Sequence, residues 1–382
     1  MKFTDCIEIV GSKPTLYEGT KQYVSTGAVE EYFINEKSIE EYSYKERPSR
    51  ADLVGKSGDI LFAKMAETKK TLILDKETEN YLFSTGFFAI RPKNGILTTK
   101  CLYYLLNSKN FLNQKDKNSS GATQKAITNA GLEKINVNIP LFFKQDQIVK
   151  QFDLLTDIIK KYQSQLKKLD TLIKSRFIEM FGNPQCILNN WKVNPLSDYC
   201  IVNPKKSELE PIPDDYELSF IPMQSVSENG DVDTSSIKHY KDVKTGFTYF
   251  RENDVLFAKI TPCMENGKGG VARKLKNQIG FGSTEFHVLR PIETISNSEW
   301  IYRLTTFKTF RKDAENNMTG SAGQRRTPKE FFDKYKVGLP PIELQNDFAA
   351  FVQQIDKSKF AVQKSLEKAE TLYKSLMQEY FG

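Results

Sequence analysis

The chain carries the stretch IPLFFKQDQIVKQFDLLTDIIKKYQSQLKKLDTLIKSRFIEMFG at residues 139–182 and, 200 residues further on, the stretch LPPIELQNDFAAFVQQIDKSKFAVQKSLEKAETLYKSLMQEYFG at residues 339–382. In the first stretch the apolar residues from Ile148 to Ile173 lie alternately four and three positions apart. This heptad spacing is typical of a helix that packs against another helix. The second stretch repeats the apolar seam, with Lys359 occupying one of its positions. The two stretches therefore predict two long helices.

A helix of this length needs a partner, because an isolated helix has little stability in water. Residues 145–180 alone would span about 54 Å at 1.5 Å per residue. The helix is predicted to end at Phe181-Gly182, with Pro184 just beyond, since glycine followed by proline is a strong stop signal. If the two copies are related by an approximate two-fold axis, their helices lie antiparallel. The alternative is two independent domains, each of which packs its own helix.

The duplication extends upstream of both helices. The number of residues between matched segments changes slightly along the chain, as it would around loop insertions. The matched segments are Phe3-Thr4-Asp5 with Leu196-Ser197-Asp198, Gly58–Lys64 with Asn253–Lys259, Ser84–Phe87 with Ser283–Phe286, and Arg91-Pro92 with Arg290-Pro291. Each copy is far longer than a solenoid unit, so this is a domain duplication. At 382 residues the chain is long enough for two separate cores.

Short runs of apolar and aromatic residues bounded by glycine, proline and polar clusters predict strands in each copy. The expected elements are strands at 59–63 and 87–90, a helix at 101–113 and an exit strand at 135–140, matched by strands at 254–258 and 285–289, a helix near 298–312 and an exit strand at 335–340. The predicted class is α+β. The expected architecture is two similar α+β domains, at 1–142 and 183–340, separated by two long antiparallel coiled-coil helices at 143–182 and 341–382, with a pseudo-two-fold internal repeat.

Composition favours an intracellular protein without a membrane span. The formal net charge is +7, which permits an anionic partner without requiring one. The five cysteines are scattered and form no CxxC pair, which is typical of reduced thiols. The first residues turn acidic before an apolar stretch of signal length can form, and no run approaches the length of a transmembrane helix. We therefore expect a soluble cytoplasmic protein.

The residues that catalysis or metal binding would require are scarce. The only two histidines, His239 and His287, have no second ligand at metal spacing. The matched segments repeat Asp59 with Asp254 and Lys64 with Lys259, but a lysine after a strand more often contacts solvent or an anion than acts as a nucleophile. The sequence predicts a chain without catalytic residues and without a metal.

Matched loops are the best candidates for binding. Each loop has backbone amides that glycine leaves accessible, together with hydroxyls, a glutamine and cationic side chains. Such groups can contact phosphate oxygens and base edges. The candidate DNA-binding residues are Lys64, Ser119, Ser120, Gly121, Thr123, Gln124 and Lys125 in the first copy, and Lys259, Thr319, Gly320, Ser321, Gly323, Gln324, Arg325 and Arg326 in the second. The first loop has less glycine and one basic residue where the second has two. The alternative interpretation of both loops is a structural turn before the exit strand.

Taken together, these segments resemble the specificity subunit of a type I restriction-modification system over essentially the whole chain. The resemblance rests on the duplicated Asp59–Lys64 and Asp254–Lys259 segments, the two glycine–glutamine loops, and the two Pro…Gln entries into a long helix that ends in Phe-Gly. It implies two target recognition domains (1–142 and 183–340), each reading one half of a split double-stranded DNA sequence, and two helical spacers (143–182 and 341–382). Two modification (methyltransferase) subunits, which would hold S-adenosylmethionine for adenine methylation, and restriction subunits are the implied partners; this chain itself would hold no cofactor.

Two other functions compete with this interpretation. The first is a non-DNA scaffold whose long helices bind partners and whose α+β heads bind peptide or carbohydrate. The second is an enzyme, a nuclease or methyltransferase of unfamiliar pattern. Steep loss of binding with salt would favour DNA over the scaffold, because neutralisation of phosphates releases counterions.

Overall fold

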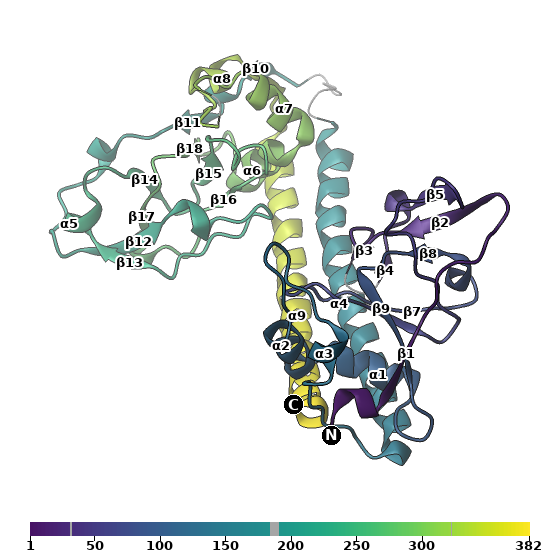
Figure 1. Cartoon of the computed structure of the whole chain (residues 1–382). Helices are drawn as coiled ribbons and strands as arrows, with labels where there is room; N and C mark the ends of the chain where they lie inside the picture. Colours follow the sequence, from purple (N-terminus) through teal and green to yellow (C-terminus); the bar gives the residue numbers. More distant parts are fainter. Residues whose placement is uncertain (31–32, 184–190, 322) are drawn as a thin grey trace. The chain divides into compact units, whose positions relative to one another are not determined.

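The computed structural model describes residues 1–30, 33–183, 191–321 and 323–382 (Figure 1). Pro184 of the predicted helix stop, Cys186 and Ala322 of the second loop lie outside the described residues. The chain divides into two compact units: unit 1 is Met1–Ser164 with Gln363–Gly382, and unit 2 is Gln165–Val362. Among the described residues, no helix combines the length and apolar character needed to cross a membrane.

Unit 1 is built on a four-stranded antiparallel sheet in the order β1-β9-β6-β7, accompanied by two smaller sheets, β5-β2-β8 and β3-β4. Its strands are β1 Ile7–Val10, β2 Thr20–Val24, β3 Val29–Glu30, β4 Phe33–Ile34, β5 Glu40–Ser43, β6 Ile60–Ala63, β7 Thr71–Ile73, β8 Leu82–Phe83 and β9 Phe87–Pro92. Its short helices are α1 Thr99–Leu106, α2 Lys109–Lys117 and α3 Asn129–Leu132.

Unit 2 repeats the main sheet as the four-stranded antiparallel sheet β11-β18-β15-β16, and it also has a four-stranded second sheet, β13-β12-β17-β14, and the pair β10-β19. Its strands are β10 Val193–Pro195, β11 Cys200–Val202, β12 Glu217–Ile221, β13 Ile237–His239, β14 Thr248–Arg251, β15 Val255–Ala258, β16 Gly269–Val271, β17 Ile279–Gly282, β18 Phe286–Pro291 and β19 Lys336–Gly338. Its short helices are α5 Tyr240–Val243, α6 Ser298–Thr306, α7 Lys308–Asn316 and α8 Glu330–Lys334. The α+β class and the internal repeat are confirmed.

The central strands β6 and β15 are buried on both faces, which explains their continuous apolar sequences. Ile60 and Phe62 belong to the cluster that includes α1, whereas Leu61 and Ala63 belong to the cluster shared with β2 and β8. This split follows from the alternation of side chains along a strand. Each main sheet therefore lies between a helical layer and a second sheet.

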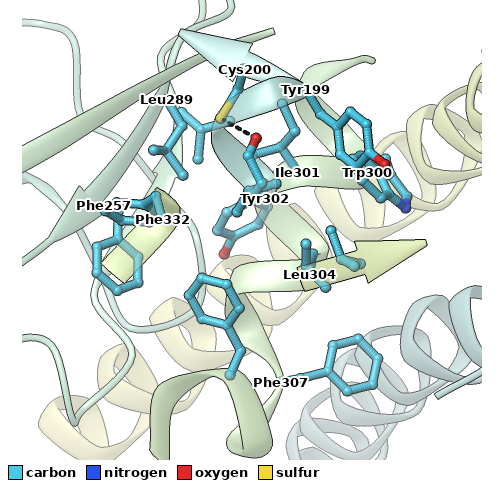
Figure 2. Close-up of a cluster of buried hydrophobic side chains, with 14 of the residues drawn as sticks. Tyr199, Cys200, Phe257, Leu289, Trp300, Ile301, Tyr302, Leu304, Phe307 and Phe332 are labelled. Atoms are coloured by element: carbon cyan, nitrogen blue, oxygen red, sulfur yellow. Dashed lines mark hydrogen bonds between the residues drawn. The ribbon is translucent and has the colours of Figure 1, made fainter. Parts of the chain in front are cut away.

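Figure 2 shows the helical side of the unit 2 core. Trp300, Ile301 and Leu304 of α6 belong to the same buried cluster as Phe257 of β15. Phe332 of α8 packs edge-on against the Phe257 ring at 5.7 Å. Side chains from these elements are almost completely withdrawn from water. Burial of this many large apolar groups is the main stabilisation of the unit.

The predicted exit strands differ between the copies. In unit 2 the segment forms β19, which pairs antiparallel with β10. In unit 1 the predicted strand 135–140 was wrong as a ladder, because the structure has a single bridge there between Lys2 and Asn136. The amide of Val137 donates to the carbonyl of Met1 at 2.9 Å.

The predicted helices at 101–113 and 298–312 are each broken into two. In unit 1, α1 ends at Leu106 and α2 begins at Lys109, with the Ser108 hydroxyl accepting the amide of Phe111 as an N-cap. In unit 2, α6 ends at Thr306 and extended Phe307 separates it from α7. Serine favours such caps because it satisfies a free amide at a helix start. Periodicity alone missed both breaks, because the apolar spacing continues across them.

The two long helices are α4 Phe142–Phe181 and α9 Ile342–Phe381, and half of each belongs to each unit. In unit 1, Phe152 near the start of α4 stacks on Phe381 at the end of α9, with ring centroids 6.0 Å apart. In unit 2, Phe181 at the end of α4 lies 5.3 Å from Phe348 near the start of α9. These contacts confirm the antiparallel pairing and rule out the alternative in which each domain packs its own helix alone.

Lys359, the break in the predicted seam, finds a partner on the facing helix. Its ammonium lies 2.7 Å from the carboxylate of Asp170 within unit 2. A lysine at a seam position replaces apolar packing with an ion pair, which fixes the register of the two helices. The contact between the two helices therefore continues through this position as an ion pair.

Candidate nucleic-acid interface

In unit 1 the predicted loop lies against the end of the central strand. The Lys64 carbonyl, directly after β6, accepts the amide of Ile127 at 2.8 Å, and the amide of Ala66 donates to the Lys125 carbonyl at 2.9 Å. Ser120 and Ala126 exchange two backbone hydrogen bonds of 3.0 Å and close the loop at its base. The structure therefore brings Lys64 together with residues 119–125.

Unit 2 builds the same arrangement. The Lys259 carbonyl accepts the amide of Thr327 at 2.9 Å, and the amide of Thr261 donates to the carbonyl of Arg325 at 3.0 Å. Thr319 and Arg326 close the loop with hydrogen bonds of 3.0 and 2.8 Å. The predicted residues of the second copy thus gather at one place, as they do in the first.

One glycine has the same structural position in both loops. Gly121 and Gly320 each follow the closing residue, with φ of +141° and +118°. A Cβ at these positions would lie 2.3 Å from the Gln124 carbonyl oxygen and 2.9 Å from that of Gln324. Both positions therefore require glycine. The second loop is one residue longer, and this extra residue shifts the offset from 199 at the glycine to 200 at the glutamine.

Most of the candidate loop residues face water. The exposed ones are Ser120, Gly121, Thr123, Gln124 and Lys125 in unit 1 and Thr319, Gly320, Ser321, Gly323 and Gln324 in unit 2. Ser119, Arg325 and Arg326 are half-buried. The Ser119 hydroxyl donates to the Lys115 carbonyl at 2.8 Å, so this side chain has a structural hydrogen bond. The remaining polar atoms of the loop tips lie where a macromolecular ligand can reach them.

The two matched lysines have different surroundings. The ammonium of Lys64 donates to the Thr85 carbonyl at 2.8 Å and lies 4.5 Å from the centre of the Phe88 ring. Burial lowers the pKa of Lys64. Burial also lowers the pKa of Lys259, while the negative charge of Glu285 acts in the opposite direction. Both lysines border their loops with a partly desolvated positive charge, which attracts an anion more strongly than a charge in open water does.

The two arginines of the second loop are already engaged. Arg326 donates from Nε and Nη2 to the Glu285 carboxylate at 2.9 and 2.8 Å, and from Nη1 to the Gln324 carbonyl at 3.1 Å. Arg325 donates to the Glu315 carbonyl at 2.7 Å. Hydrogen bonding to Arg326 is the main cause of the lowered pKa of Glu285. Glu285 was not among the predicted site residues. The aligned segments do show that a glutamate occupies this position in the second copy where the first copy has Gly86.

A buried cation supports the turn below each loop. Lys115 of α2 is 1% exposed and donates to the carbonyls of Met65 and Thr68 at 2.6 and 2.9 Å. In unit 2, Arg311 of α7 donates to the Met264 carbonyl at 3.0 Å. Burial lowers the pKa of both groups, to about 10 for Arg311. Sequence comparison missed this pair because the two cations come from non-equivalent positions of their helices.

His287 lies below the exit of the second loop, where its Nε2 is 2.8 Å from the Thr327 carbonyl and its Nδ1 is 3.0 Å from Asn203 Nδ2. Burial lowers the pKa of His287 to about 4. The ring is therefore neutral near pH 7 and holds the loop exit by hydrogen bonds. Within residues 1–30, 33–183, 191–321 and 323–382, no three His, Cys, Asp or Glu side chains form a group that could hold a metal ion.

Two similar α+β units, each with a glycine–glutamine loop beside a lysine at the end of the central strand, define a duplicated recognition protein. The family model described as the type I restriction modification DNA specificity domain matches residues 8–168 and again residues 189–370. The chain belongs to this family, and the resemblance noted from the sequence is confirmed.

Curated relatives match part of the chain. The type I restriction enzyme EcoAI specificity subunit of Escherichia coli is 42% identical over 160 residues, which are 41% of this chain and 26% of the relative. The EcoEI specificity subunit of the same species is 36% identical over 187 residues, which are 49% of this chain and 30% of the relative. The matched part thus spans less than a third of the length of either relative.

Two solved structures share the fold. One, from work on complex assembly and conformational transition of the type I R-M system, has a TM-score of 0.57 at 19% identity and covers 98% of this chain and 97% of its own. The other is the type I restriction-modification S subunit from M. genitalium, with a TM-score of 0.53 at 12% identity, covering 100% of this chain and 95% of its own. At these identities the likeness concerns the fold.

Proposed function

We propose that the chain is a non-catalytic DNA sequence-specificity subunit that recognises a bipartite double-stranded target. The observation that carries this proposal is the repetition of the same surface loop and the same flanking lysine in both copies. Residues 1–142 and 183–340 would each read one half-site as target recognition domains. The segments 143–182 and 341–382 would be the helical spacers between the two.

The composition of the two loops suits DNA. Exposed hydroxyls, a glutamine and backbone amides can bind phosphate oxygens, and a glutamine can pair bidentately with adenine. Lys64 and Lys259 add positive charge at the same edge of each site. Because each copy carries its own residues at the loop tip, the two half-sites can differ in sequence while the backbone contacts stay similar.

The long helices carry a repeated feature that suits two identical partners. Leu172 and Leu372 occupy the same position in the two copies and are 45% and 50% exposed. A single exposed leucine is unremarkable. A leucine exposed twice at equivalent positions of α4 and α9 supports docking of two like subunits, one at each. We propose that these are the modification (methyltransferase) subunits, that they hold the S-adenosylmethionine for adenine methylation, and that restriction subunits join them for cleavage.

The test is co-expression of this chain with the modification (methyltransferase) subunit of a type I system that assembles with it, followed by single-molecule sequencing of methylated adenine in the host DNA. We expect methylation at one split motif, two short half-sites around a fixed unspecified gap. A chain in which residues 1–142 are exchanged for those of another specificity subunit is the matched control, and it should change one half-site only. Methylation at a continuous site, or none from an assembled complex, would contradict the proposal.

The flanking lysines are expected to contribute non-specific electrostatic affinity. Lys64→Ala and Lys259→Ala should each weaken binding of all DNA sequences alike and reduce the slope of log affinity against log salt by about 1. In the double variant the slope of log affinity against log salt should fall by about 2, because each lysine belongs to a separate site. The measurement is fluorescence anisotropy of the assembled complex on labelled duplexes over a salt series.

Lys359→Ala is the matched control for the salt series, since this lysine is paired with Asp170 on the helices. It should leave the slope unchanged. An unchanged slope for Lys64→Ala and Lys259→Ala as well would show that neither lysine contacts a phosphate.

A further inference from the structure

The Glu285–Arg326 pair leaves part of the Arg326 guanidinium unused. An arginine has five N–H groups. Three of them, on Nε, Nη2 and Nη1, donate to Glu285 and to the Gln324 carbonyl. In the part of the chain that the structure describes, no acceptor is assigned to the other two, one on each terminal nitrogen. The side chain is 42% exposed, so these two donors can reach a ligand.

Glu285 determines which edge of the guanidinium is available. Because the carboxylate occupies the side formed by Nε and Nη2, the end of the guanidinium formed by Nη1 and Nη2 carries the remaining N–H of Nη2 beside an N–H of Nη1. Two parallel donors on a planar group match two adjacent acceptors. In the major groove, O6 and N7 of guanine are such a pair of acceptors.

We propose that Arg326 reads a guanine in the half-site bound by the second recognition domain, and that Glu285 is the positioning residue that orients it. The inference rests on the proposed DNA-recognition function and deepens it. A phosphate could also accept hydrogen bonds from the free end of the guanidinium. However, the side-on carboxylate holds the guanidinium in a fixed orientation, and this suits recognition of a base better. A phosphate contact needs charge and little orientation, whereas a base contact needs a defined plane and direction.

The first recognition domain cannot form this pair. Gly86 and Ala126 occupy the positions of Glu285 and Arg326, and the same backbone segments meet there through the Lys64–Ile127 and Ala66–Lys125 hydrogen bonds. A Cβ on Gly86 would lie 2.8 Å from Cγ2 of Thr26, so a glutamate does not fit without movement of its neighbour. The guanine contact is therefore assigned to one half-site only.

The test compares the assembled wild-type complex with the Arg326→Ala, Arg326→Lys and Glu285→Gln variants on a randomised duplex library. For Arg326→Ala we expect loss of guanine preference at a single position of one half-site, about tenfold to a hundredfold, with every other position unchanged. Arg326→Lys keeps the charge without the fork and should relax the same position. Glu285→Gln should relax it in part, since the amide accepts only one of the two bonds.

Arg303→Ala is the matched control, because it removes another arginine–glutamate pair of unit 2, with Glu299 on α6. It should leave the motif intact. Uniform weakening of all sequences by Arg326→Ala, with full rescue by Arg326→Lys, would show a phosphate contact and overturn the inference. A wild-type complex that selects no split motif would instead overturn the proposed function, so the two failures are distinguishable.

Discussion

The Asp254→Ala variant is expected to lower the free energy of unfolding by about 3–5 kcal/mol. Asp254 is 1% exposed and accepts Nε and Nη2 of Arg290 at 2.8 and 2.7 Å. It also accepts the amide of Arg251 at 2.7 Å and so fixes the turn before the central strand. Removal of the carboxylate leaves a mostly buried guanidinium with one remaining carboxylate, Glu208.

The pKa of Arg290 explains why the loss is large. Burial acts to lower this pKa, but hydrogen bonds to Asp254 and Glu208 outweigh it, and the pKa is raised. The charge is therefore held in place mainly by its carboxylate partners. Without Asp254 the desolvation of the guanidinium is poorly compensated. Urea unfolding followed by far-ultraviolet circular dichroism measures the difference.

The first copy provides the matched control. Asp59 also accepts Nε and Nη2 of its arginine, Arg91, but on one oxygen, Oδ1, at 2.8 and 2.5 Å. The Arg91 side chain is 43% exposed, whereas that of Arg290 is 14% exposed. Water can solvate Arg91 after Asp59→Ala, so the loss should be about 1–2 kcal/mol. Equal losses in the two variants would show that the turn, rather than the buried charge, determines the effect.

The second large effect is expected for Gln345→Leu, which should lower the free energy of unfolding by about 2–4 kcal/mol. Gln345 is fully buried; its Nε2 donates to the carbonyls of Ile295 and Pro340 at 3.0 and 2.9 Å, and its Oε1 accepts the amide of Asn297 at 3.0 Å. One side chain thus joins the exit segment, the start of α6 and the start of α9. Leucine is of similar size to glutamine, so the substitution creates only a small cavity. Its main effect is that three buried backbone groups lose their hydrogen-bond partner.

The measurement is urea unfolding together with hydrogen exchange at the Asn297 amide, which should exchange faster in Gln345→Leu. Gln145→Leu should behave alike, since Gln145 bonds Ile96, Pro140 and Thr98 at 2.8, 3.0 and 2.9 Å. Gln353→Leu, at an exposed position of α9, is the control and should change stability by less than about 0.5 kcal/mol. A comparable loss in that variant would show that the helix as a whole tolerates no apolar replacement.

Much of the fold was predictable because the duplication doubled the signal. Two weak apolar runs, Asp59–Ala63 and Asp254–Ala258, became convincing strands when they recurred in the same order, and the heptad seam gave both long helices within a few residues. The breaks at Ser108 and Phe307 were missed. They depend on a local cap and on one extended residue, neither of which alters the apolar spacing.

The candidate site was predictable in composition but not in arrangement. The matched loops and lysines were found from the sequence, and the structure brings them together. The engagement of Arg326 by Glu285, and the support of the turns by Lys115 and Arg311, were not found. Those contacts join residues 40–50 positions apart, and the two supporting cations occupy unmatched positions, so no internal comparison reveals them.

The sequence by itself determined that this protein is a duplication with two α+β domains, two long helices and a matched pair of polar loops, because periodicity and repetition are local or translational properties of the chain. The tertiary structure alone decided which residues of the loops remain free. Whether an arginine faces a ligand or a carboxylate depends on which strand end lies beside it, and that neighbour is set by the packing of the sheet against the helices.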